Sequence, residues 1–384
     1  MIFNNKKKKT VVHFPIELEN KKYQGGIYGY YHEDSNNYNI VEYGEKSSLK
    51  KIGIVFNKKE EIVDDVSGLI IGYYENNSLM FFKDDLNCEK KPYELEVNIF
   101  SRNSGILETG KMLNKSAIIS GCGSVGSLVA LELARSGVGS FLLVDNDIFE
   151  YHNICRHQCG VKDVGKNKVD ALEERILDIN PNAKVVKQNT ILERVPEKVF
   201  NEFIVKPDEV ILIGCGDNRE SDLYANKISY IFNIPFLSIG FWERAFAGEV
   251  FYSIPHETAC YHCQFNSMVG TELDFRVNKN HRFYIDEKEV YETTFEPGIS
   301  VDINFVTAIG IKLIIDILNR HDEEYIPKVM NDLSQYTFIA NTNNPKIGGE
   351  MAEIFAYPLQ VTTSIVVDKD EKCSICVKKG NTNG

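Results

Sequence analysis

The segment GCGSVG at residues 121–126 constrains the fold of this chain more than any other feature. A short apolar strand is expected just before it, at residues 117–119, and a mostly apolar helix just after it, ending at about Ser136. A second apolar strand at 141–144 ends in Asp145, about 20 residues after the glycines, where an acid can bind ribose hydroxyls. Strand, glycines, helix and acid together predict a nucleotide-binding unit of the Rossmann type.

Each residue type in this turn has an expected role. Gly121 permits the tight turn, Gly123 lets the backbone approach a phosphate, and Gly126 allows the helix to pack closely on the strand. Ser124 opens the helix, whose first N–H groups can bind an anion. We therefore expect these four residues to contact nucleotide.

The rest of the chain from Lys115 alternates strands and helices, which predicts an α/β fold with a doubly wound parallel sheet. Helices are expected at 168–179, 196–203, 220–232 and 300–319, and strands at 184–186, 209–213, 235–239, 249–254 and 354–367. The polar segment 270–296 is expected to be a loop.

Residues 1–98 have a different pattern. Six short runs rich in β-branched and aromatic residues are separated by polar clusters, and Asn76 and Asn77 predict a hairpin turn. We expect an N-terminal β-rich α+β module that recognises a partner, or else a structural appendage. The predicted organisation is 1–98 for this module, 99–376 for the nucleotide-binding domain and 377–384 for a polar tail.

The composition is that of an ordinary soluble protein, with 43% apolar and 26% charged residues in 384. A net charge of −12 argues against a nucleic-acid partner, and the basic run 6–9 is expected to be a solvated tail. No signal peptide is visible at the start of the sequence, and the apolar run 301–318 contains Asp302, Lys312 and Asp316. We therefore expect a cytoplasmic location, no membrane partner and a buried helix.

Four of the nine cysteines form two C-x-x-C pairs, Cys260 with Cys263 and Cys373 with Cys376. Two such pairs can complete the tetrahedral sulfur set of a structural zinc ion, with no open position for catalysis. A redox dithiol or ordinary buried thiols are the alternatives.

Taken together, the motifs resemble those of the ThiF/MoeB/HesA superfamily of ubiquitin-activating-enzyme-like adenylyltransferases. They are GCGSVGS, VDND at 144–147, EYHNICRH at 150–157, DVGKNK at 163–168, GDN at 216–218 and the two cysteine pairs. The resemblance implies an ATP-binding variant of the Rossmann fold that is usually a homodimer. It also implies adenylation of the C-terminal carboxylate of a ubiquitin-like protein, a small carrier protein or a peptide, with ATP, Mg²⁺ and Zn²⁺ as cofactors.

The resemblance also assigns site residues. Those implied to contact nucleotide or metal are Asp145 on the ribose, Asp147, Asn153, Arg156, Lys168, Asn218, and Asp217 on magnesium, with Asn226 one helix further on. Arg102 resembles an arginine that reaches in from the partner subunit. Attack of a carboxylate on ATP joins two anions, so Arg102, Arg156 and Lys168 provide the cations that such a reaction requires.

The sequence departs from the family pattern at several positions. Position 157 is His where many members have Gln, and Asp222 stands where an arginine is common. Residues 264–300 contain no cysteine, although members that form a thioester usually carry one there. Cys155 and Cys159 lie beside the nucleotide motifs and are the remaining candidates, with packed thiols as the alternative.

These departures leave several functions open. The leading hypothesis is activation of a ubiquitin-like carrier in a bacterial conjugation pathway, in which the acyl-adenylate passes directly to another nucleophile, such as a conjugating enzyme's cysteine, a sulfur donor or an amine. A peptide nucleotidyltransferase of the peptide-antibiotic type is the alternative within this superfamily. An NAD-dependent oxidoreductase would share the glycine turn but would not account for Lys168, Asp217 and the cysteine pairs. An inactive scaffold is the remaining reading.

Overall fold

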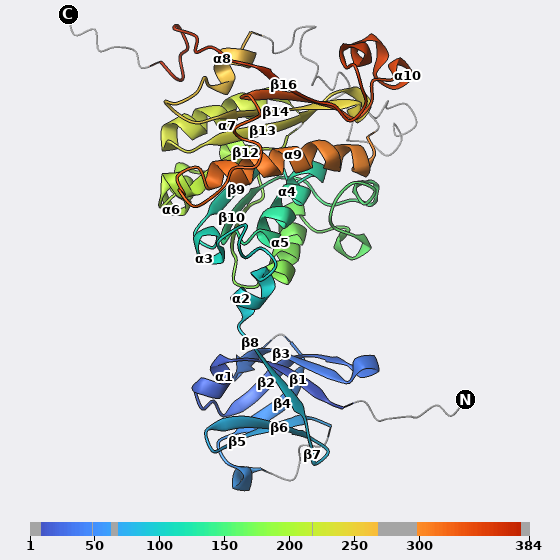
Figure 1. Ribbon diagram of the computed structural model, residues 1–384, viewed down its shortest axis with the longest axis vertical. Coiled ribbons are helices and arrows are strands. Elements are labelled where there is room, and N and C mark those ends of the chain that lie inside the picture. Colours follow the sequence, from blue (N-terminus) through green and yellow to red (C-terminus); the bar gives the residue numbers. More distant parts are fainter. Residues whose placement is uncertain (1–8, 48, 63–67, 217, 268–297, 378–384) are drawn as a thin grey trace, which may run out of the picture. The chain divides into compact units, whose positions relative to one another are not determined.

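The computed structural model describes residues 9–47, 49–62, 68–216, 218–267 and 298–377. The chain divides into two compact units, residues 1–102 and 103–384. Figure 1 shows both units, the first in blue and the second from blue-green to red.

The first unit is built on one eight-stranded sheet in the order β7-β6-β5-β4-β2-β3-β1-β8. Its core contains Val12, Phe14, Ile27, Ile40 and Phe81, all fully buried. The predicted hairpin at Asn76 and Asn77 is confirmed, since both residues have positive φ between two antiparallel strands. Its elements are β1 (Val11–Pro15), α1 (Glu17–Asn20), β2 (Gly25–His32), β3 (Asn37–Gly44), β4 (Lys51–Phe56), β5 (Ile70–Glu75), β6 (Ser78–Lys83), β7 (Leu86–Asn87), β8 (Glu89–Tyr93) and α2 (Leu95–Phe100).

The second unit contains the predicted Rossmann-like sheet, in the order β11-β10-β9-β12-β13-β14-β15-β16. The first five strands in this order are parallel, and β9 lies between β10 and β12. Its elements are α3 (Thr109–Met112), β9 (Ser116–Ser120), α4 (Ser124–Arg135), β10 (Ser140–Val144), α5 (Lys168–Ile179), β11 (Lys184–Gln188), α6 (Glu197–Phe203), β12 (Val210–Gly214), α7 (Arg219–Phe232), β13 (Phe236–Phe241), β14 (Ala247–Ser253), α8 (Tyr261–Phe265), α9 (Ser300–Leu318), β15 (Tyr336–Ala340), α10 (Pro345–Gly348) and β16 (Val361–Ile365).

Helices cover both faces of this sheet, and each strand supplies side chains to both layers. In β9, Ala117 and Ile119 pack in a core with α4, α5 and α9, whereas Ile118 packs in a second core with α6, α7 and α8. Side chains alternate between the two faces of a strand, so a strand covered on both faces must be apolar throughout. This explains the continuous apolar runs that identified β9, β10 and β12 in the sequence.

The far edge of the sheet differs from the prediction. β14, β15 and β16 are antiparallel, so the sheet is mixed and not wholly parallel. The predicted strand 354–367 is wrong over its first half: Ile354 ends a 3₁₀ helix, residues 356–359 form bends and a turn, and Leu359 has a φ of 55°. Pro358 cannot donate a ladder hydrogen bond, which explains why β16 begins only after it. The predicted loop 270–296 lies outside the described residues.

Helix α9 is the buried helix that the run 301–318 predicts. It packs against α4, β13 and β14 and buries most of its apolar side chains, although Val301 at its first turn is 72% exposed. Among the described residues, no helix is long and apolar enough to cross a membrane.

Candidate nucleotide and metal sites

The glycine turn connects β9 to α4 at the carboxyl end of the parallel strands. Gly121 has a φ of +91°, and a Cβ there would lie 3.0 Å from the carbonyl oxygen of Cys215. A Cβ on Gly126 would lie 1.9 Å from the carbonyl oxygen of Gly121, so only glycine allows α4 to start this close to the turn. A Cβ on Gly123 would meet nothing within 4 Å. The turn therefore has the shape that the sequence predicts, with open space at Gly123.

Asp145 accepts two backbone hydrogen bonds, one of them from the glycine turn. Its Oδ2 accepts from the N–H of Cys122 at 2.6 Å and its Oδ1 from the N–H of Asp147 at 2.8 Å. Burial raises the pKa of Asp145, while the positive charge of Lys168 opposes the shift. The structure thus places Asp145 against the glycine turn, where its predicted contact with ribose stays a prediction.

Lys168 and Asp147 form an ion pair beside the same turn. The Lys168 Nζ lies 2.6 Å from the Asp147 Oδ2, and the Lys168 side chain is 10% exposed against 57% for Asp147. Lys168 is the first residue of α5, and its backbone N–H also donates to the Asp147 carbonyl at 2.9 Å. A mostly buried ammonium is therefore held close to the turn by an acid that faces solvent.

Asn153 and Arg156 lie in the segment between β10 and α5. The Asn153 Oδ1 accepts from the Glu150 N–H at 2.9 Å, so this side chain fastens a local turn. The half-buried Arg156 places its Nη1 3.8 Å from where a Cβ on Gly298 would lie, just before α9. No carboxylate among the described residues pairs with Arg156, so its guanidinium is available to bind an anionic ligand.

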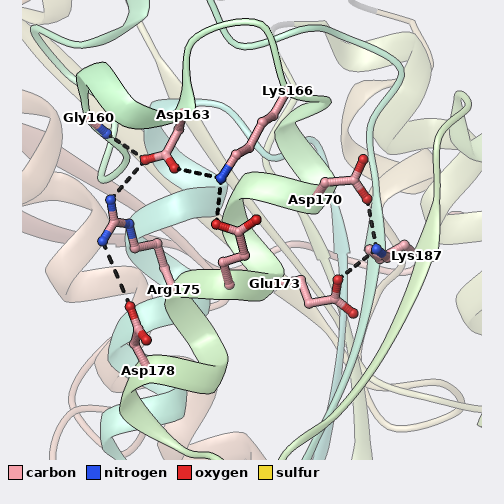
Figure 2. Close-up of polar contacts among 9 residues, drawn as sticks. Gly160, Asp163, Lys166, Asp170, Glu173, Arg175, Asp178 and Lys187 are labelled. Atoms are coloured by element: carbon pink, nitrogen blue, oxygen red, sulfur yellow. Dashed lines mark hydrogen bonds and ion pairs between the residues drawn. The ribbon is translucent and has the colours of Figure 1, made fainter. Parts of the chain in front are cut away.

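A cluster of charged residues anchors this segment to α5 (Figure 2). The carboxylate of Asp163 is 2% exposed and accepts from the Gly160 N–H at 3.0 Å, Arg175 at 2.9 Å and Lys166 at 3.3 Å. Burial favours the neutral acid, but these three donors together hold the pKa of Asp163 below its ordinary value. Lys187 of β11 pairs with two acids of α5 in the same view. The segment that carries Arg156 is therefore fixed to the start of α5, where Lys168 lies.

His157 makes a contact that sequence reasoning missed. Its Nδ1 accepts from the Cys159 N–H at 3.0 Å, so its Nε2 carries the proton and donates to the carbonyl of Cys122 at 2.7 Å. Burial lowers the pKa of His157 to about 4, so the imidazole is neutral near pH 7. The signal available in the sequence was the family's Gln at this position, which can make the same two hydrogen bonds.

The predicted roles of three site residues stay predictions. Asp217 lies outside the described residues. Asn218 caps α7, accepting from the Ser221 N–H at 2.8 Å, and its predicted nucleotide contact stays a prediction. Arg102 is exposed and is the last residue of the first unit, so its predicted role also stays a prediction.

The cysteines of the two C-x-x-C pairs meet in one cluster. All four Sγ atoms lie within 4.8 Å of one another, with Cys260 to Cys263 at 3.7 Å, Cys260 to Cys373 at 3.5 Å and Cys263 to Cys376 at 3.4 Å. Zinc–sulfur bonds of about 2.3 Å in a tetrahedron require sulfur–sulfur distances of roughly 3.8 Å. The cluster therefore fits one zinc ion, and the N–H of Asp370 donates to Cys263 at 3.4 Å, as around bound thiolates.

The other thiols differ in their access to solvent. Cys155 is exposed, whereas Cys88, Cys122, Cys159 and Cys215 are buried. Burial raises the pKa of Cys159 to about 11, which makes it a packed thiol and a poor nucleophile. Of the two candidates that the sequence singled out, only Cys155 can meet another protein.

Asp222 and Arg219, at the start of α7, belong to a buried polar network. Asp222 accepts from Ser238 at 2.5 Å and from Tyr261 at 3.3 Å, and Arg219 pairs with Glu249 at 2.7 Å with both side chains at most 3% exposed. The residue that departs from the family's arginine is thus internal to the fold. Sequence reasoning missed Arg219, because an isolated Arg ordinarily indicates an exposed surface.

Comparison with known proteins places this site in a family. A model described as the ThiF family matches residues 96–352, two thirds of the chain. The chain belongs to the ThiF family. The match spans the glycine turn, the Arg156 segment, Lys168 and the first cysteine pair.

Curated proteins and solved structures also resemble this chain. Ubiquitin-like modifier-activating enzyme 5 of Dictyostelium discoideum is 29% identical over 198 residues, which cover 48% of this chain and 52% of that protein. The enzyme of the same name from Caenorhabditis briggsae is 28% identical over 174 residues, which cover 43% of this chain and 40% of that protein. This ThiF-family chain spans about half the length of the curated relatives it matches. Escherichia coli MccB with ATP superposes with a TM-score of 0.51 at 22% identity, covering 73% of this chain and 74% of MccB. A second structure, of MccB with N-formylated MccA, gives 0.51 at 20% identity, covering 73% and 76%. At this identity the likeness shows a shared fold.

Proposed function

We propose that this protein adenylates the C-terminal carboxylate of a small carrier protein or peptide at the expense of ATP. The observation that carries the proposal is the corner formed by the glycine turn, Asp145, Asp147 and Lys168 at the carboxyl end of the parallel strands. Ligands of open α/β sheets bind at the carboxyl edge, at the point where the chain changes its direction across the sheet. Here the chain runs from β9 to β10 and β11 on one side and then returns to β12 on the other side of β9. Family membership supports the same site.

The charges of the corner suit this reaction. A carboxylate oxygen of the cargo forms a bond to the α-phosphorus of ATP, the bond from that phosphorus to the bridging oxygen breaks, and pyrophosphate leaves. The first-turn N–H groups of α4 have no intrahelical partner and would donate to the phosphates, and Lys168 and Arg156 would bring positive charge to the phosphoryl oxygens. Magnesium, which we assign to Asp217, would supply further positive charge when bound.

A ubiquitin-like or other small carrier protein is the cargo that we favour. The support comes from the curated relatives, whose names describe activation of ubiquitin-like modifiers. Since residues 264–300 contain no cysteine, the acyl-adenylate would pass directly to a separate acceptor, such as the cysteine of a conjugating enzyme in a bacterial pathway. Exposed Cys155 is the residue that could carry a thioester instead.

A peptide is the second cargo class. The observation that favours it is the separate N-terminal unit, whose eight-stranded sheet gives the chain a further surface for recognition. A folded carrier and a short peptide make different demands on that unit. Deletion of residues 1–94, which keeps Arg102, should abolish the activation of a short peptide, whereas a carrier that binds the second unit would still be adenylated.

The test is ATP–pyrophosphate exchange with small proteins and peptides encoded beside the gene. Exchange that requires a free cargo C-terminus is expected, and it should be lost when that carboxylate is amidated. Lys168→Ala should reduce exchange by about 100-fold or more, since it removes a cation from the transition state. Lys162→Ala is the matched control, because Lys162 is an exposed lysine six residues before Lys168. Equal loss in both variants, or thermal stabilisation of the protein by NAD and not by Mg–ATP, would contradict the proposal.

A further inference from the structure

Tyr261 joins the cysteine cluster to helix α7 at three points. Its hydroxyl accepts from the Nη1 of Arg219 at 3.1 Å and donates to the Oδ2 of Asp222 at 3.3 Å, and its backbone N–H donates to the Oδ1 of Asn226 at 3.0 Å. Positions 219, 222 and 226 lie on one face of the helix. One face of α7 therefore binds Tyr261, the residue that follows Cys260 in the chain.

A buried ion pair between Arg219 and Glu249 stabilises this contact. Glu249 of β14 pairs with Arg219 at 2.7 Å and accepts from the Trp242 indole N–H at 3.1 Å and the Tyr336 hydroxyl at 2.7 Å. Arg219 also lies 4.2 Å from the ring centre of Phe265, the last residue of α8. Because every member is buried and hydrogen-bonded, movement of one of them would leave a charge unpaired inside the protein.

The same network reaches the glycine turn. A Cβ on Gly214 would lie 2.1 Å from the Oδ1 of Asp222, so this carboxylate packs directly on the end of β12. The next residue, Cys215, donates its N–H to the Ser120 carbonyl at 2.8 Å, and its own carbonyl lies against Gly121. Asp222 therefore contacts the backbone that borders the nucleotide turn.

Helix α8 depends on its surroundings for its position. It has five residues, and its N-cap residue, Cys260, makes no side-chain cap hydrogen bond. A helix this short is not stable by itself. Its anchors are the cysteine cluster, which ties it to Cys373 and Cys376, and the contacts of Tyr261 with α7.

From these contacts we infer that zinc binding to the four cysteines sets the affinity of the glycine turn for nucleotide, with Tyr261, Asp222, Arg219 and Glu249 as positioning residues. The bound ion fixes α8, α8 fixes Tyr261, and Tyr261 fixes the first turn of α7 and the end of β12. This inference rests on the proposed nucleotide site. The metal takes no part in the reaction itself.

The first experiment uses the only tryptophan in the chain, Trp242, as a reporter of the network. Full-length protein with a measured zinc content is compared with protein stripped by a chelator, dialysed and supplied with magnesium. Zinc removal should shift the Trp242 emission and weaken Mg–ATP binding by about tenfold, and zinc addition should reverse both. Unchanged affinity for Mg–ATP in folded, zinc-free protein would overturn the inference, whether or not the emission of Trp242 changes.

The second experiment combines zinc removal with Tyr261→Phe, which removes the hydroxyl that contacts Arg219 and Asp222. The variant should retain one zinc ion, bind Mg–ATP several-fold more weakly, and lose little further affinity when zinc is removed. Tyr325→Phe is the matched control, because the Tyr325 hydroxyl donates to the buried carboxylate of Asp316 at 2.6 Å outside this network. This control should bind ATP as the parent does and respond fully to zinc.

The outcomes separate this inference from the proposed function. If zinc-loaded parent protein binds no ATP, the proposed function fails, yet the emission of Trp242 still reports whether zinc orders the network. If ATP binds and the effects of zinc removal and Tyr261→Phe simply multiply, the two act independently and the inference is refuted. Should Tyr261→Phe not fold, the zinc dependence of the parent's emission and affinity decides.

Discussion

Replacement of His157 by Gln tests how the glycine turn is held. The neutral imidazole donates to the Cys122 carbonyl through Nε2 and accepts from the Cys159 N–H through Nδ1. Glutamine can make both hydrogen bonds with its amide N–H and its carbonyl oxygen, but it cannot bind a proton. His157→Gln should therefore preserve the fold and remove a pH dependence that the parent protein shows.

The magnitude follows from the pKa of His157. Burial lowers it from the ordinary 6.5 to about 4, so between these values the unfolded chain binds a proton that the folded chain does not. The free energy of unfolding should therefore fall as the pH drops below about 6.5, by about 2 kcal/mol at about pH 5 and by about 3 kcal/mol at full protonation. Above about pH 7.5 both states are neutral and the contribution is constant.

The assay is urea unfolding of the parent and of His157→Gln at several pH values between about 5 and 8, with zinc in slight excess. Other carboxyl and histidine groups also titrate in this range, but they are the same in both proteins. The difference in unfolding free energy between the two proteins therefore isolates His157. It should change by about 2 kcal/mol over this range, in the direction that makes the variant relatively more stable in acid.

A constant difference across the range would refute this reasoning, since it would mean that His157 binds its proton equally well in the folded and unfolded states. NMR titration of the imidazole C–H signal in the folded protein gives an independent measurement. A midpoint near 6.5 in the folded protein would contradict the hydrogen-bonding pattern that we describe. A midpoint near 4, as the burial of the ring requires, would agree with it.

Three further predictions concern the anchor of the Arg156 segment, the cysteine cluster and the partner subunit. Asp163→Asn leaves two cations without their buried acid, so urea unfolding should show a loss of about 2 kcal/mol, and nucleotide binding should weaken if the segment is displaced. Cys376→Ala should abolish tight zinc binding in a metal-release assay and lower the Tm by roughly 4–8 °C, and an unchanged zinc content would contradict the four-cysteine site. If the protein is a homodimer in which Arg102 acts across the interface, mixed and reassembled Arg102→Ala and Lys168→Ala subunits should recover roughly a quarter of the parent exchange activity. A monomeric mass in sedimentation, or no recovery on mixing, would refute that arrangement.

The sequence predicted the part of the fold that depends on local patterns. Continuous apolar runs identified β9, β10 and β12, because strands covered by helices on both faces must be apolar throughout. The glycine turn was predictable because positive φ and the close approach of backbone atoms at Gly121 and Gly126 exclude other residues. The two C-x-x-C pairs predicted the sulfur cluster, since nothing else in the sequence required such spacing.

Contacts between residues distant in sequence were not predictable in this way. The antiparallel pairing of β14, β15 and β16 depends on partners up to about a hundred residues apart, and no local pattern specifies their direction. Arg219 and Glu249, each an ordinary surface residue by type, are buried only because they neutralise each other. His157 stood out in the sequence as a departure from a family pattern, but its partner Cys122 lies 35 positions earlier.

The glycine turn is therefore held in shape before any nucleotide arrives. Asp145 accepts from the N–H of Cys122, and His157 donates to the carbonyl of the same residue, so both backbone polar groups of Cys122 are hydrogen-bonded within the protein. The first-turn N–H groups of α4 have no intrahelical partner and stay available to a phosphate. Because folding has already met the entropic cost of ordering the turn, more of the binding energy can appear as nucleotide affinity. Loss of either side chain should thus weaken nucleotide binding even though neither supplies a cation to the phosphates.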